Sequence, residues 1–360
     1  SEFWTAFPAL KKALFTESGI PYVNVSTPDI KSAIKSHPDV VGFEDAFNAA
    51  FSTFPAFLKE ELIDRMESIE ISKAETVLSA DIFERLKEIP LIDKYAAFQL
   101  LDDDWTGISI DLEVLQTEGF SATKEVDPNL VIKKKDGKDQ EVQEGWVGHI
   151  IPFDLVQATL LSTETDELHG LESRLAEIPS EYESILDEMT EEDKESCNDV
   201  LTEEGDAFVP KEVSKKIKDL KKDRSPESVA LRTLLEKVES LVKSEKEIKA
   251  EIKAKSAALQ AKTKDTIESL SDEQALDLLE KKWIAPLIES IHKLPDTVID
   301  SLVSKIQALQ NKYATTFFEV EQQISETEAT LSGMIDDLEG NEYDMLGLNE
   351  LKKLLGGSAE

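Results

Sequence analysis

The sequence predicts a mainly α-helical protein: a helical domain with a small β-hairpin element, followed by a long antiparallel coiled-coil-like helical hairpin. Three observations predict this fold. Apolar residues recur at three- and four-residue steps through the last third of the chain. An Asp-Gly pair stands between two alternating apolar segments. Charged residues make up 32% of the chain, as long solvated helical faces require. We expect two domains, residues 1–225 and residues 226–360.

The first heptad run begins after residue 226. Its apolar residues alternate three- and four-residue steps, so one seam of a helix faces a partner helix. These seam residues are Leu231, Leu234, Val238, Leu241, Ile248, Ile252 and Leu259. No proline interrupts the helix between Glu227 and Ala285. Glu245, Lys255 and Lys262 also fall on seam positions, where we expect them to demand charged partners.

The second run starts after Pro295, which suits the first turn of a helix. Its seam residues are Ile299, Leu302, Ile306, Leu309, Tyr313 and Val320, continued after a shift by Ile324, Leu331, Ile335 and Leu338. Each run is about 45 residues long, or roughly 65 Å of helix at 1.5 Å per residue. Two such rods joined by a short segment are expected to fold back on each other.

A two-helix hairpin buries one stripe per helix, which leaves apolar residues such as Leu287, Ile291 and Phe317 outside it. Leftover apolar surface of this kind predicts further helices, from this chain or from a partner. We therefore predict that partner helices dock on Leu231, Leu234, Val238, Leu241, Ile248, Ile252, Ile299, Leu302, Ile306, Leu309 and Tyr313. The alternative is that the two helices satisfy only each other.

The amino-terminal part combines short helices with one β element. Five phenylalanines at three- or four-residue intervals predict a buried helix face: Phe43, Phe47, Phe51, Phe54 and Phe57. Apolar residues then alternate with polar ones over 108–114 and 130–132, and Asp136-Gly137 is a strong hairpin turn signal. We expect two or three strands between residues 108 and 151.

Composition limits the partners. The formal net charge is -35, so the chain as a whole repels the phosphate backbone of nucleic acids. A lysine-rich segment, residues 211–224, is a local exception that we interpret as a solvated helix face. Cys197 is the one cysteine, which fits a reducing cytoplasm. No apolar run approaches the roughly 20 residues that a membrane-spanning helix needs.

No motif for catalysis is present in the sequence. The glycines never reach the spacing of a phosphate-binding loop, and no serine lies in a nucleophile elbow. The four histidines are far apart, with no second His or Cys at metal-ligand spacing: His37, His149, His169 and His292. We therefore predict no catalytic, cofactor-binding or metal-binding residue in this chain.

A series of short blocks runs in order through most of the chain. The first joins Pro90-Leu91-Ile92-Asp93-Lys94-Tyr95 to Phe98-Gln99 and Trp105. The later blocks are Gly145-Trp146, Ile151-Pro152-Phe153-Asp154-Leu155, Gly205-Asp206-Ala207-Phe208, Lys281-Lys282-Trp283-Ile284, Leu294-Pro295, Lys312-Tyr313-Ala314-Thr315-Thr316 and Gly340-Asn341-Glu342. Together they resemble the carboxy-terminal part of the modification (M) subunit of type I restriction-modification systems.

This resemblance implies a parent DNA adenine methyltransferase that uses S-adenosylmethionine. The chain has neither the Gly-rich cofactor loop nor the Asn-Pro-Pro-aromatic motif of that family, so it would be a non-catalytic fragment that needs no cofactor. It begins at Ser1-Glu2-Phe3 without methionine, from which we expect a piece of a longer protein. The family resemblance implies docking on the helices of the specificity (S) subunit and, through it, association with DNA and the restriction (R) subunit.

Two other interpretations are open. One is a free-standing coiled-coil scaffold or adaptor unrelated to DNA modification, and genes for specificity and restriction subunits beside this one would argue against it. The other is an acidic mimic of DNA, which would present carboxylates at the spacing of phosphates. The lysines interspersed among the acidic residues argue against that mimic.

Overall fold

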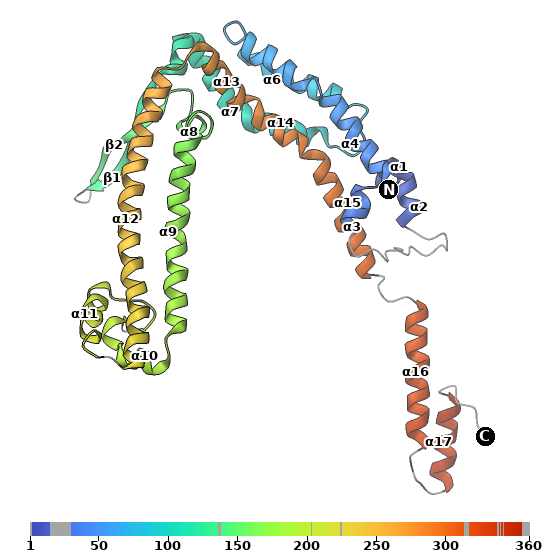
Figure 1. The fold of residues 1–360 in the computed structure, drawn as a ribbon. Helices are drawn as coiled ribbons and strands as arrows, with labels where there is room; N and C mark the ends of the chain where they lie inside the picture. The colour runs from blue at the N-terminus through green and yellow to red at the C-terminus, as the bar shows by residue number, and fades with distance from the viewer. Residues whose placement is uncertain are drawn as a thin grey trace. The chain divides into compact units, whose positions relative to one another are not determined.

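The computed structural model describes residues 2–14, 30–135, 138–202, 204–223, 225–312, 317–336, 338, 340 and 342–354. Within these residues the protein is mainly helical with one antiparallel two-stranded hairpin, as the sequence predicts (Figure 1). The chain forms two compact units, each built from separate segments. The first unit comprises residues 1–56, 75–103 and 287–360, and the second comprises residues 57–74 and 104–286. The predicted domain boundary at residue 225 falls at the start of the longest helix in the second unit.

Helices build the first unit. Their bounds are α1 Glu2–Ala6, α2 Pro8–Leu14, α3 Ile30–Lys35, α4 Pro38–Phe51, α5 Phe54–Leu58, α6 Ile71–Arg85, α7 Lys94–Glu118, α15 Leu294–Lys312, α16 Phe317–Asp336 and α17 Glu342–Leu354. α5, α6, α7 and α14 (Ala285–His292) each continue across a boundary between the units, and residues 287–292 of α14 belong to the first unit.

The core of the first unit forms where α15 packs on α3. The two helices are antiparallel, because Lys31 pairs with Asp300 and Lys35 pairs with Asp296, each at 2.7 Å. Phe7, between α1 and α2, meets side chains from α2, α3, α4 and α15 there: Leu10, Leu14, Ile30, Ile34, Val40, Phe43, Ile299, Leu302, Val303 and Ile306.

Four of the five phenylalanines of the predicted stripe are buried in the core, Phe43, Phe47, Phe51 and Phe54, and Phe57 is half-buried. The rings of Phe47 and Phe51 stack with centroids 4.7 Å apart, and Phe54 meets Phe51 edge to face. Arg85 closes this face by donating to the Ala50 carbonyl at 2.7 Å. This aromatic packing agrees with the prediction that a helix face crowded with phenylalanine gains most by burial.

The second unit contains the hairpin and the longest helices. Its elements are the π-helix η1 Lys59–Asp64, η2 Phe120–Lys124, β1 Val126–Lys135, β2 Lys138–Gly148, α8 Phe153–Thr159, α9 Ser162–Glu188, α10 Glu191–Ser196, η3 Asn198–Val200, α11 Pro210–Leu220, α12 Pro226–Glu268, α13 Asp272–Trp283 and the start of α14 Ala285–His292. α12 begins at a side-chain cap, because the Ser225 hydroxyl accepts a hydrogen bond from the backbone N–H of Ser228.

The β element has two strands, within the two or three predicted, but it begins later in the chain than the alternating pattern indicated. β1 pairs antiparallel with β2, Val131 lies opposite Val142, and the pairing closes at Lys135 and Lys138. The predicted turn residues between those lysines lie outside the described residues. Residues 108–114, predicted as a strand, are helical and belong to α7. The reason is a second, overlapping pattern: a heptad of buried side chains, Leu101, Trp105, Ile108, Leu112 and Leu115, runs along one face of that helix.

The long antiparallel helical pair exists, but its members differ from the prediction. α12 packs against α9, and the two lie side by side in Figure 1. The second heptad run, from Ile299 on, belongs to the other unit, where α15 packs on α3. A heptad seam specifies that a helix needs a partner without specifying which helix supplies it, so the prediction that the two runs pair was wrong.

Candidate partner-docking surface

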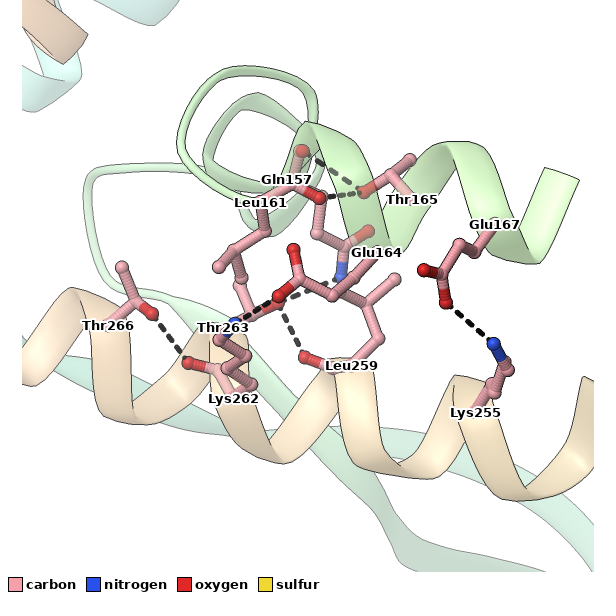
Figure 2. A network of polar contacts seen from close by, with 10 residues as sticks. All are labelled: Gln157, Leu161, Glu164, Thr165, Glu167, Lys255, Leu259, Lys262, Thr263 and Thr266. Carbon is pink, nitrogen blue, oxygen red and sulfur yellow. Dashed lines mark hydrogen bonds and ion pairs between the residues drawn. The ribbon is translucent and has the colours of Figure 1, made fainter.

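The α9–α12 pair is held in register by charged and polar contacts between the helices. Lys262 pairs with Glu164, and Lys255 pairs with Glu167 at 2.6 Å, as Figure 2 shows. Further along, the Tyr182 hydroxyl donates to Glu245 at 3.1 Å. Residue numbers rise along α9 as they fall along α12, so the helices are antiparallel. Lys255 and Lys262 thus have charged partners on α9, as predicted, whereas Glu245 meets the neutral Tyr182 there and pairs with Lys249 of its own helix.

Electrostatics favours the charged forms of these groups. The ammonium of Lys262 lowers the pKa of the Glu164 carboxyl, and Glu167 raises the pKa of Lys255. Burial, together with the hydrogen bond to Glu245, raises the pKa of Tyr182 to about 12. That hydroxyl therefore remains protonated at neutral pH and remains a donor.

One polar side chain is buried between the two helices. Thr263 is fully buried and donates its hydroxyl hydrogen to the Leu259 carbonyl at 2.7 Å. The Gln157 amide from α8 donates to the same hydroxyl oxygen at 3.1 Å, and both contacts are visible in Figure 2. Because both capacities of the hydroxyl are used, this buried polar group carries little penalty.

Beyond Tyr182, α10 and α11 close the end of the α9–α12 pair. α11 also packs along α12, so two helices contact α12 there. The resulting core contains Ile185, Leu186, Met189, Cys197, Val200, Leu201, Val213, Ile217, Leu231, Leu235, Val238 and Leu241. The lysine-rich segment forms α11 and continues beyond it, and it exposes Lys211, Lys215, Lys218, Lys221 and Lys222, as a solvated helix face does.

The predicted docking residues of the first run are mostly covered by this chain. Leu231, Val238, Leu241 and Ile248 are buried, and Leu234 and Ile252 are half-buried. Leu235, absent from the predicted seam, is fully buried. Adjacent leucines at 234 and 235 both fit a three/four pattern, and α12 buries a wider face because it has two neighbours.

The second run divides into a covered part and an exposed part. Ile299, Leu302 and Ile306 are buried in the first unit's core and Leu309 is half-buried, whereas Tyr313 lies outside the described residues. Docking of a partner on all eleven predicted residues stays a prediction. Because Ile299, Leu302 and Ile306 are already buried, the part of the second run that a partner can reach lies in α16.

The exposed apolar seam lies along α16 and just past its end. Its members follow steps of four and three residues, with Thr327 at the one polar position. They are Val320 (40% exposed), Ile324 (53%), Leu331 (43%), Met334 (62%) and Leu338 (52%). α17 packs on α16, and Ser332 and Ile335 are the more buried residues of α16. α17 exposes three large apolar side chains of its own: Tyr343, Leu346 and Leu351.

Such a seam is the feature that most suggests a docking site. Scattered apolar residues are normal on protein surfaces, but a row at heptad spacing presents continuous apolar surface to water. Burying it against a partner helix would be favourable by about 25 cal/mol per Å2 of apolar surface removed from water. We define the α16 seam as Val320, Ile324, Leu331, Met334 and Leu338.

A buried junction in the second unit escaped sequence analysis. Asp111 of α7 accepts hydrogen bonds from the Lys282 ammonium and, at 2.8 Å, from the Trp283 indole N–H. Lys282 also donates to the Ile150 carbonyl at 2.6 Å. Close by in the chain, Gly148 approaches the carbonyl of Ile151 so closely that an added Cβ would lie 1.7 Å from its oxygen. The junction ties α7 and α13 to the segment after β2.

His149 belongs to the same part of the second unit. Its Nδ1 lies 2.6 Å from an oxygen of Asp127, and its Nε2 lies 3.2 Å from an oxygen of Glu118. The hydrogen bond to Asp127 is the main cause of a raised pKa for His149. No sequence signal brings these three residues together, because they come from α7, β1 and the segment after β2.

Within the described residues, two kinds of feature are absent. None of the helices in that part of the chain combines the length and hydropathy of a membrane span. Nor does any group of three His, Cys, Asp or Glu side chains there have a geometry that could hold a metal ion.

Comparison with known proteins adds no relative. The chain matches no protein-family model, no curated protein and no solved structure.

Proposed function

We propose that this chain is a non-catalytic assembly segment of a DNA adenine methyltransferase, the carboxy-terminal part of a type I modification subunit. In this role it docks on the helices of the specificity subunit and so holds the methyltransferase against its DNA target. The ordered sequence blocks, from Pro90 to Glu342, support the family. The helical fold with its extended α12 is compatible with such a segment.

The observation that carries the docking role is the exposed α16 seam. Five apolar side chains at heptad spacing are left open to water, although the same run is buried further back at Ile299 and Ile306. A helix from another chain would cover this surface in the way that α3 covers α15. Catalysis and cofactor binding would belong to the parent subunit rather than to this segment.

The test is complex formation with the specificity subunit encoded beside this chain. We expect the two proteins to co-elute in size-exclusion chromatography, and we expect the double variant Ile324→Ser, Leu331→Ser to elute separately. A matched control removes two exposed apolar side chains elsewhere, Val77 and Ile132, by the same change to serine. That control should still co-elute. Separate elution of the wild-type proteins would contradict the proposed function.

A further inference from the structure

The charge around the α16 seam is acidic, and the nearest basic residues after the seam in the sequence are Lys352 and Lys353 at the end of α17. Between residues 313 and 351 the sequence contains ten acidic residues and no lysine, arginine or histidine. The ten are Glu319, Glu321, Glu326, Glu328, Asp336, Asp337, Glu339, Glu342, Asp344 and Glu350. The rest of the chain carries 40 Lys and Arg residues, and its helices pair many of them with carboxylates. Residues 313–351 therefore differ from the rest of the chain in having charged residues of one sign.

Two of the acidic residues border one side of the seam in the sequence, and the other side has Gln323 and Thr330. In the heptad register of the seam, Glu321 follows Val320 and Glu328 follows Thr327, which places both at positions bordering the seam. In coiled coils these bordering positions form interhelical ion pairs and select the partner. Glu326 is exposed on the same helix, where it accepts a hydrogen bond from the neutral amide of Gln322 at 3.0 Å.

From this arrangement we propose that the α16 seam and α17 bind a basic amphipathic helix of a partner protein, one whose apolar stripe is bordered by lysine or arginine. This inference rests on the proposed function, since it specifies the chemistry of the partner helix at the same surface. Opposite charges along the borders would attract such a helix and fix its register.

The same charges exclude two other occupants. A second copy of this chain would bring its own acidic segment against the first, and like charges facing each other are unfavourable. A nucleic acid would present phosphates to carboxylates, which is also repulsive. An acidic or neutral apolar helix would bury the seam but would make no favourable electrostatic interaction with the carboxylates that border it.

Two labelled peptides test the proposal without any natural partner. Both contain about four heptads with the same leucine and isoleucine seam. One carries lysine and the other glutamate at the bordering positions. Fluorescence anisotropy with the full chain should show the lysine peptide binding about tenfold more tightly than the glutamate peptide at low salt. High salt should reduce that difference, because exposed ion pairs are screened.

Variants of the chain show which residues cause the preference for the lysine peptide. The triple variant Glu321→Gln, Glu326→Gln, Glu328→Gln should reduce the preference for the lysine peptide to about threefold, while Ile324→Ser with Leu331→Ser should abolish binding of both peptides. A control with the same change in charge is Glu172→Gln, Asp187→Asn, Glu195→Gln, at exposed positions of α9 and α10. This control should keep the tenfold preference.

Several outcomes would overturn the proposal. Equal affinity for the two peptides, or a preference that high salt leaves unchanged, would remove the role of charge. A wild-type dimer at low salt that Ile324→Ser disperses would show that the seam binds a second copy. The proposed function can fail separately: if the specificity subunit does not co-elute while the lysine peptide binds as expected, the partner chemistry stands and the family assignment falls.

Discussion

Asp111 offers the sharpest test of what holds the second unit together. Its carboxylate is 8% exposed and receives both the Lys282 ammonium and the Trp283 indole N–H. Replacement by alanine leaves the buried indole N–H without a partner, which costs about 1–3 kcal/mol. It also removes a charge-assisted hydrogen bond worth about 1.5–3 kcal/mol. Lys282 is partly exposed and keeps the Ile150 carbonyl, so we expect a total near the low end, about 3 kcal/mol.

Asparagine provides the matched comparison. Asp111→Asn keeps the shape and an oxygen acceptor for Trp283 but removes the charge that faces Lys282. We expect it to cost about half as much as alanine, roughly 1.5 kcal/mol. Two compact units make a single global unfolding free energy unsafe, so a local probe is needed.

Amide hydrogen exchange of peptides from α13 is that probe. A loss of about 3 kcal/mol should speed exchange in α13 by about a hundredfold in Asp111→Ala, and by about tenfold in Asp111→Asn. Peptides from α3, in the first unit, should exchange as in the wild type. Exchange in α13 that changes less than threefold in Asp111→Ala would refute the reasoning.

Three further predictions concern the second unit. Gly148→Ala should destabilise it by about 3 kcal/mol because its Cβ would overlap the Ile151 carbonyl. Gly170→Ala, with open space around it, should stabilise α9 by about 0.5–1 kcal/mol, and amide hydrogen exchange of peptides from α8 and α9 compares the two variants. The contacts that raise the pKa of His149 stabilise the protein fully below about pH 6.5, and this stabilisation is lost as pH rises through the folded pKa. The difference in stability between wild type and His149→Gln should therefore shrink from about pH 6 to about pH 9. A difference that stays constant over that range would contradict this prediction. Leu235→Ala should cost about 2–5 kcal/mol and Leu234→Ala clearly less, as measured by amide hydrogen exchange of peptides from α12, and the reverse order would place the α12 seam where the sequence alone put it.

Patterns that depend on one segment of chain were predictable. The phenylalanine stripe has one helical period, which favours burial of that face, and four of its five rings are buried. The hairpin followed from an Asp-Gly pair between two alternating segments, because that pair fits a tight turn. In residues 108–114, by contrast, alternation and a heptad overlap, and burial of Trp105, Ile108 and Leu112 on one face decided for the helix.

Features that join distant segments were not predictable. The sequence indicated that α12 needs a partner, but α9 and the second heptad run both offered apolar residues at suitable spacing. Choosing between them required the contacts themselves, including the pairing of Lys255 with Glu167. The Asp111 junction and the His149 contacts likewise join residues far apart in the chain, and no local pattern marks them.

The same limit applies to the docking surface. Heptad spacing identified Val320, Ile324 and Leu331 together with Ile299 and Ile306 as one seam. Exposure separates them, because the chain's own α2, α3 and α4 cover the inner part of the run while α16 presents its side chains to water.

The most direct measurement is hydrogen exchange of this chain with and without the specificity subunit. Binding through the α16 seam predicts slower exchange in peptides covering residues 317–336 and 342–354, with exchange in α12 and α15 unchanged. Protection confined to α12 or α15, with α16 exchanging as fast as in the free chain, would contradict the proposed docking surface.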